Sequence, residues 1–161
     1  MKTFEIAVTV NGQVVTDRVI PRMSLLDFLR DRAGLTGTHM GCEHGVCGAC
    51  SVIYDGAPVR SCSVLAVQAN GKEVMTVEGL TNDDGTMNDL QMAFQDAHAM
   101  QCGYCIPGML VAAHALLEGN HDPELEDIKE AIGGNICRCT GYIQIIEAIQ
   151  LAAARRQDAA S

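Results

Sequence analysis

The 161-residue sequence predicts an α+β protein in which a small sheet-containing part precedes an all-helical part. At the start of the chain apolar and polar residues alternate, which is the period of a half-buried strand. After residue 86 apolar residues recur every three or four positions, which is the period of an amphipathic helix. All eight cysteines fall into two sets of four, one set in each part. We therefore expect a sheet domain over residues 1–77, a polar linker over 78–85 and a helical domain over 86–161.

The turns of the first part have the residues that tight hairpins need. Asn11-Gly12 and Asp55-Gly56 each separate two apolar runs, and these dipeptides favour the left-handed backbone of a two-residue hairpin turn. Ser24 is expected to cap a short helix, since a serine oxygen accepts a hydrogen bond from a free N–H at a helix start. The expected strands cover residues 4–10, 14–15, 51–54, 59 and 74–77, and the expected helix covers 25–29.

The second part predicts four helices with brief connections. Pro107 is tolerated in a first helical turn, and Asp122-Pro123 is expected to cap the next helix. Short connections favour antiparallel neighbours, so the loops over 101–105 and 135–141 should meet at one end of a helical bundle. The expected helices cover residues 87–97, 107–117, 123–132 and 142–149.

The first cysteine set has the spacing of a plant-type [2Fe-2S] site. A C-x4-C-x2-C run is followed by a fourth cysteine, which is the signature of that cluster. Three glycines lie beside or between the first three thiols, where they permit turns that direct backbone N–H groups at the sulfurs. The expected ligands of the first cluster are Cys42, Cys47, Cys50 and Cys62.

The second cysteine set consists of a C-x2-C pair and a C-x-C pair in the two loops that should converge. Two clusters with four thiolates each would use all eight cysteines and leave no spare thiol. The expected ligands of the second [2Fe-2S] cluster are Cys102, Cys105, Cys137 and Cys139.

Other uses of these thiols are less favoured. Disulfides need an oxidising compartment, and the amino terminus has no apolar stretch or cleavage site of a secretory signal, so we expect a cytoplasmic protein. Structural zinc fits a four-thiolate set such as the second one, but a cluster signature in the same chain favours iron–sulfur there too. His39 and His44 are not needed as ligands, because eight cysteines fill eight positions.

Composition excludes several functional classes. Asp and Glu number 20 against 11 Lys and Arg, and the formal net charge of −9 disfavours nucleic acid as a partner. No apolar run approaches the ~20 residues of a membrane span. The chain also lacks a glycine-rich nucleotide motif and a nucleophile constellation. Electron relay to partner redox centres, as a subunit of a larger oxidoreductase, is the function that two clusters favour.

Three ordered motifs resemble the small iron–sulfur subunit of the molybdenum hydroxylases, the superfamily of xanthine dehydrogenase and aerobic carbon monoxide dehydrogenase. They are Gly-Cys-Glu-His-Gly-Val-Cys-Gly-Ala-Cys at 41–50, Gln-Cys-Gly-Tyr-Cys-x-Pro-Gly at 101–108 and Gly-Asn-Ile-Cys-Arg-Cys-Thr-Gly-Tyr at 134–142. The resemblance spans nearly the whole chain. It implies a plant-ferredoxin-like (β-grasp) domain followed by an all-α four-helix-bundle domain.

The resemblance also implies partners and a direction of electron flow. A large subunit would hold molybdopterin cytosine dinucleotide and a medium subunit would hold FAD, in a heterotrimer that can be doubled to a heterohexamer. Electrons would leave molybdenum through the helical-domain cluster and pass through the first-domain cluster to FAD or another acceptor. By the same resemblance Gln101 and Cys139 would contact the pterin, and this chain would not touch the substrate.

Some assignments stay open at this stage. The Gln101 amide either contacts the pterin or satisfies a loop carbonyl, and Arg138 either stabilises a reduced cluster or braces its loop through an ion pair. Ile106 stands where the family commonly has threonine, which removes a hydroxyl near the second cluster. The holoenzyme substrate could be an N-heteroaromatic compound, an aldehyde, carbon monoxide or an aromatic thioester, and residues 43–46 are most similar to subunits of N-heteroaromatic hydroxylases.

A free-standing soluble electron carrier is the alternative function. An acidic surface would suit docking to basic reductases. The helical part argues against this alternative, because a carrier needs only the first cluster module.

Overall fold

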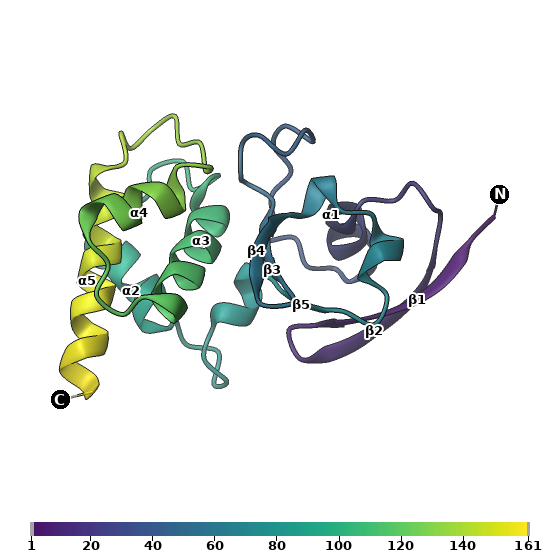
Figure 1. Cartoon of the computed structure of the whole chain (residues 1–161), viewed down its shortest axis with the longest axis horizontal. Helices are drawn as coiled ribbons and strands as arrows, with labels where there is room; N and C mark the ends of the chain where they lie inside the picture. The colour runs from purple at the N-terminus through teal and green to yellow at the C-terminus, as the bar shows by residue number, and fades with distance from the viewer. Residues whose placement is uncertain (1, 161) are drawn as a thin grey trace.

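The structure, a computed structural model, describes residues 2–160 and shows two parts side by side (Figure 1). One part contains the sheet and the N-terminus, and the other contains the longer helices and the C-terminus. Each part has a hydrophobic core of its own. The predicted α+β class is confirmed at this level.

Five strands form one mixed sheet in the order β2-β1-β5-β3-β4. β1 is antiparallel to β2 and parallel to β5, whereas β3 is antiparallel to both β4 and β5. Both hairpins are confirmed, because Asn11, Gly12, Asp55 and Gly56 have positive φ angles of 50°, 77°, 46° and 83°. The strands are β1 (Phe4–Val10), β2 (Gln13–Val19), β3 (Ser51–Tyr54), β4 (Ala57–Arg60) and β5 (Glu73–Met75).

A short helix packs against the sheet. Ser24 caps it as predicted, since its Oγ accepts a hydrogen bond from the Asp27 N–H at 3.0 Å. The α-helical turn α1 (Leu25–Asp27) continues as a π-helix, η1 (Phe28–Arg32), which the apolar spacing did not predict. Leu25 and Phe28 are fully buried in the core beneath the sheet. Three 3-10 helices complete this part and its exit, η2 (Ser61–Ser63), η3 (Ala66–Ala69) and η4 (Val77–Leu80).

The exit segment is more structured than a polar linker. Leu80 is only 5% exposed and belongs to the core of the helical part. The Glu78 carboxylate accepts hydrogen bonds from the Gly37 N–H at 2.7 Å and from the Thr76 hydroxyl at 2.6 Å. These bonds hold the start of the connection against the loop that leads to the first cysteine set.

The helical part contains the four expected helices with shifted ends. They are α2 (Asp89–Asp96), α3 (Ile106–Gly119), α4 (Leu125–Ile132) and α5 (Ile143–Ala160). The predicted cap of α4 at Asp122-Pro123 is wrong. Glu124 is the N-cap, and its backbone N–H donates to Asp127 Oδ2 at 2.9 Å.

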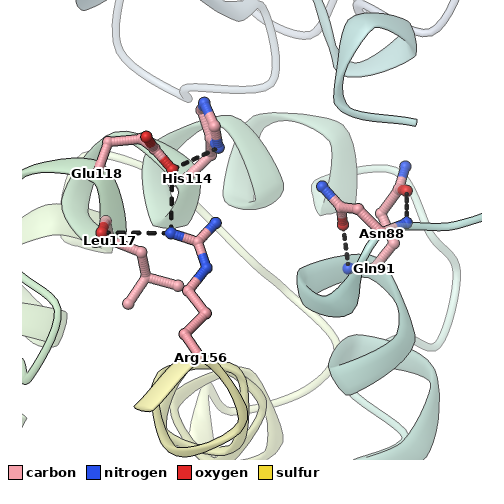
Figure 2. A network of polar contacts seen from close by, with 6 residues as sticks. All are labelled: Asn88, Gln91, His114, Leu117, Glu118 and Arg156. Carbon is pink, nitrogen blue, oxygen red and sulfur yellow. Dashed lines mark hydrogen bonds and ion pairs between the residues drawn. The ribbon is translucent and has the colours of Figure 1, made fainter. Parts of the chain in front are cut away.

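Helix packing buries the apolar stripes of these helices. Phe94, Met109 and Ile145 are fully buried in one core, and α2 packs against α5. Arg156 ties α5 to α3 by donating to Glu118 Oε1 at 3.0 Å and to the Leu117 carbonyl at 3.3 Å (Figure 2). In the described part of the chain, no helix has the length and apolar character needed to cross a membrane.

The start of α2 gives a first test of the fold. Asn88 and Gln91 form a reciprocal capping box with two hydrogen bonds of 2.8 Å (Figure 2). Asn88→Ala removes the cap acceptor and should lower the free energy of unfolding by about 1 kcal/mol. Urea unfolding followed by circular dichroism measures this change. Asn88→Ser keeps an acceptor and is the matched control, so equal destabilisation by both variants would contradict the assigned cap.

Candidate metal centres

The first cysteine loop, residues 41–50, wraps its backbone around its own sulfurs. The N–H groups of His44 and Cys47 each approach Cys42 Sγ at 3.4 Å, as the glycine-rich sequence predicts. A Cβ at Gly41 would lie 2.8 Å from Cys47 Sγ, which explains why no larger residue fits at that position. This loop therefore has the backbone geometry of a site for a negatively charged group.

The fourth cysteine of this set is delivered by the second hairpin. Cys50 precedes β3 and Cys62 follows β4, and the antiparallel register pairs Ser51 with Arg60 between them. Ser61 holds the two open ends of the hairpin together, because its N–H and its hydroxyl both donate to the Cys50 carbonyl, at 3.2 and 2.7 Å. The hairpin thus brings together two thiols that lie twelve positions apart in the sequence.

The second cysteine set comes together from two distant loops. Cys102 and Cys139 have their sulfurs 3.5 Å apart, although 37 positions separate them. Cys105 and Cys137 lie within side-chain hydrogen-bonding reach of each other. The predicted convergence of the two loops at one end of the helices is confirmed.

Within each set the side-chain hydrogen-bonding contacts join the thiols two by two. In the first set Cys42 interacts with Cys47, and Cys50 interacts with Cys62. In the second set the pairs are Cys102 with Cys139 and Cys105 with Cys137. Among residues 2–160, no three His, Cys, Asp or Glu side chains converge as ligands of a single ion. Two pairs fit a two-iron cluster with two thiolates on each iron better than they fit one tetrahedral zinc ion.

The environments of the thiols differ strongly. Backbone N–H groups of His44, Cys47 and Val46 lower the pKa of Cys42 from its ordinary value of 9.0 to about 6. Burial raises the pKa of Cys50 to about 11 and that of Cys105 to about 12. A bound cation would therefore have to stabilise the thiolate forms of Cys50 and Cys105.

Hydrogen bonds outweigh burial at Cys137. Burial alone would raise the pKa of this thiol, but the side chain and backbone N–H of Thr140 lie 3.1 and 3.4 Å from its sulfur and the pKa is lowered. The backbone N–H of Cys137 donates to the Tyr142 hydroxyl at 2.8 Å. Thr140 and Tyr142 thus support one ligand position, a role that sequence reasoning did not assign.

The other expected site residues surround the exposed pair Cys102 and Cys139. Gln101 and Arg138 are exposed, and neither side chain forms a hydrogen bond or ion pair with any part of the described chain. A loop-bracing ion pair for Arg138 is therefore absent within residues 2–160. Ile106 is 7% exposed and packs into the helical core, so its side chain serves packing at the start of α3.

The two cysteine sets are directly connected. The N–H of Ile136, which precedes Cys137, donates to the Cys47 carbonyl at 2.8 Å. Tyr104, which precedes Cys105, stacks on His39 with ring centroids 4.7 Å apart, and His39 Nδ1 lies 2.8 Å from the Tyr104 carbonyl. The loops that carry the two cysteine sets are thus held against each other, and this arrangement is that of a protein with two neighbouring metal-binding sites.

Comparison with known families gives the same two modules. The 2Fe-2S iron-sulfur cluster binding domain matches residues 8–81, and a second [2Fe-2S] binding domain matches residues 76–150. Caffeine dehydrogenase subunit gamma of Pseudomonas sp. (strain CBB1) is 52% identical over 153 residues, covering 93% of this chain and 91% of that subunit.

Two further relatives extend the likeness. The nicotine 6-hydroxylase small subunit of Paenarthrobacter nicotinovorans is 52% identical over 145 residues, covering 90% of this chain and 87% of that subunit. In the crystal structure of quinoline 2-oxidoreductase from Pseudomonas putida 86, a chain with 48% identity superposes with a TM-score of 0.91, and 98% of each chain is covered.

The chain belongs to the family of small iron–sulfur subunits of molybdenum hydroxylases. It is the electron-transfer subunit of a multi-subunit oxidoreductase, and the free-standing carrier is not favoured. The family resemblance carried by the three sequence motifs is confirmed.

The contrast between Cys42 on one side and Cys50 and Cys105 on the other can be measured on the reduced, metal-free chain. Because the thiolate is the reactive form, Cys42 should be alkylated by iodoacetamide with a half-maximal rate near pH 6. Cys50 and Cys105 should stay unmodified at neutral pH, because their pKa values are raised to about 11 and 12. Peptide mass spectrometry over a pH series resolves the sites. Modification of Cys105 before Cys42 would contradict the assigned environments.

Proposed function

We propose that this chain holds its two [2Fe-2S] clusters through the four cysteine pairs described above. Cys42 and Cys47 would bind one iron of the first cluster, and Cys50 and Cys62 the other. The second cluster would be bound by Cys102, Cys105, Cys137 and Cys139, paired in the same way. The observation that carries the proposal is the pairing of thiols in both sets. When bound, each cluster supplies one-electron redox chemistry.

Exposure suggests the direction of the relay. Cys102 and Cys139 are exposed, and Ile136 and Ile143, three and four positions from Cys139 in the sequence, remain uncovered at 54% and 62% exposure. Exposed apolar surface of this kind is typical of a protein interface. We assign this surface to the large molybdopterin-binding subunit, with the first cysteine set facing a medium FAD subunit or another acceptor.

Gln101 and Cys139 are proposed to contact the pterin of the partner subunit. The Gln101 amide is exposed and makes no hydrogen bond within residues 2–160, so its donors and acceptor are available to a partner group. Cys139 is exposed beside it on the paired loop. This support favours cofactor contact over the alternative in which Gln101 only satisfies a loop carbonyl.

The finer organisation belongs to the same proposal. We assign a β-grasp, ferredoxin-like domain to residues 1–77, a connection to 78–85 and an antiparallel four-helix bundle to 86–161. The complex would contain molybdopterin cytosine dinucleotide and FAD on its partners, as a heterotrimer or its doubled form, in the cytoplasm. We expect no nucleic acid among its partners, given the net charge of −9.

The substrate class proposed for the holoenzyme is an N-heteroaromatic ring. Caffeine dehydrogenase, nicotine 6-hydroxylase and quinoline 2-oxidoreductase are named for compounds of that class, and the chain is similar to a subunit or chain of each. The chemistry would take place on the large subunit. Turnover assays of the purified complex with N-heteroaromatic compounds, aldehydes and carbon monoxide would decide, and activity on the last two alone would exclude the proposed class.

Reciprocal cysteine variants test the two ligand sets in the holoenzyme. Cys139→Ala should reduce electron flow from molybdenum to background while the first cluster still assembles. Cys42→Ala should leave the second cluster reducible by substrate but block passage to the acceptor. Iron content, electron paramagnetic resonance of each cluster and substrate-dependent acceptor reduction distinguish these outcomes. Retained turnover of Cys139→Ala with an acceptor at the flavin would contradict the proposed relay.

A further inference from the structure

A closed ring of hydrogen bonds joins the two parts of the chain beside both cysteine sets. Arg60 Nη1 donates to Ser51 Oγ at 2.8 Å, and the Ser51 hydroxyl donates to the Gly48 carbonyl at 2.7 Å. Asn135 closes the ring from the helical part. Its Nδ2 donates to the same Gly48 carbonyl at 3.2 Å, and its Oδ1 accepts from Arg60 Nη2 at 3.3 Å.

Partial opening of this ring would cost free energy, because two of its members are buried. Ser51 and Asn135 are each 2% exposed, so a small shift would leave their polar atoms unpaired and still shielded from water. Arg60 Nη2 also donates to the Gly134 carbonyl at 2.6 Å. The planar guanidinium thus directs one nitrogen at each part of the protein, a geometry that a lysine ammonium does not reproduce.

Three glycines allow the two parts to approach this closely. A Cβ at Gly108 would lie 2.3 Å from the Gly48 carbonyl oxygen, and one at Gly134 would lie 2.3 Å from Arg60 Nη2. A Cβ at Gly48 would lie 2.6 Å from the Gly134 carbonyl oxygen. Both faces of the contact are therefore built for close approach.

Every member of the ring lies within two positions of an expected cluster ligand in the sequence. Gly48 follows Cys47 and Ser51 follows Cys50, while Arg60 lies two positions before Cys62. Asn135 lies two positions before Cys137, and the next residue, Ile136, donates its N–H to the Cys47 carbonyl. A movement of the ring would therefore move both cysteine sets relative to each other.

We propose that Arg60 and Asn135 are positioning residues that fix the separation and relative orientation of the two clusters. The inference rests on the ligand sets proposed above. Electron passage between two centres depends steeply on their separation, so the ring would set the rate of the internal step. Neither side chain binds a cluster, and no bond is formed or broken at them.

The first test compares Arg60→Met with wild type in the purified holoenzyme. Methionine keeps an apolar stem of similar length and removes every donor. Iron content should stay unchanged, whereas the magnetic coupling between the two reduced clusters should weaken in electron paramagnetic resonance. Hydrogen–deuterium exchange of the segment 133–138 should become about tenfold faster, because a hydrogen bond to a charged group is lost.

Arg32→Met is the matched control. Arg32 lies in the same part of the protein, its side chain is 46% exposed, and within residues 2–160 it pairs only with Asp17 at 3.6 Å, so its loss should change neither the magnetic coupling nor the exchange rate. Arg60→Lys keeps the positive charge but loses the planar group with two donor nitrogens. Its magnetic coupling and exchange rate should therefore lie between those of wild type and Arg60→Met. Asn135→Ala should weaken the coupling as Arg60→Met does, and the double variant should add little to either.

The outcomes separate this inference from the proposed function. Wild-type protein without two clusters would contradict the proposed ligand sets. Two intact clusters with wild-type coupling and wild-type exchange in both Arg60→Met and Asn135→Ala would overturn the positioning role alone. Loss of iron from both variants would overturn it too, because the ring would then be needed for cluster assembly instead of orientation.

Discussion

The structure depends on the contact between the first cysteine loop and the segment that precedes Cys137. Each expected metal centre is built from two chain segments that are distant in sequence, and this contact additionally joins one centre to the other. The Gly48 carbonyl accepts hydrogen bonds from the backbone N–H and hydroxyl of Ser51 and from the Asn135 amide. One peptide group thus connects the sheet, the first cysteine set and the helical part.

The remaining elements bring the thiols to this contact. The second hairpin delivers Cys62 to Cys50 through its register, and the 3-10 helix η4 leads the chain from the sheet into the helical core. The helices then place two loops at one end, where the sulfurs of Cys102 and Cys139 lie 3.5 Å apart. Sheet and helices therefore serve as scaffolds for one chain of redox sites, which is consistent with an electron-transfer subunit.

Local chemistry made much of the fold predictable. Asn-Gly and Asp-Gly turns, the Ser24 cap and the change of apolar period each depend on residues close in sequence, and the structure has them all. The cysteine spacing likewise predicts the first ligand set, because a compact cluster constrains the intervening loop length, and the second set is predicted from the four remaining thiols. The convergence of the two helical loops followed from short connections alone.

Long-range pairing could not be predicted in the same way. Asp122 fits the preferred N-cap residues better than Glu124 does, but the helix begins after Glu124, whose N–H donates to Asp127 Oδ2. The sequence did not single out Arg60, since an arginine at the end of a strand is common. Its partner Asn135 lies 75 positions away. The π-helix η1 has the same apolar residues as the predicted α-helix.

The central claim is that this chain relays electrons from a molybdenum subunit through two clusters. The most direct test is to purify the native complex through a tag on this chain and to measure iron, molybdenum and flavin in one sample. Our account predicts a large molybdenum-bearing partner and about four irons per chain, two for each cluster. Iron without molybdenum and without a partner subunit would contradict it.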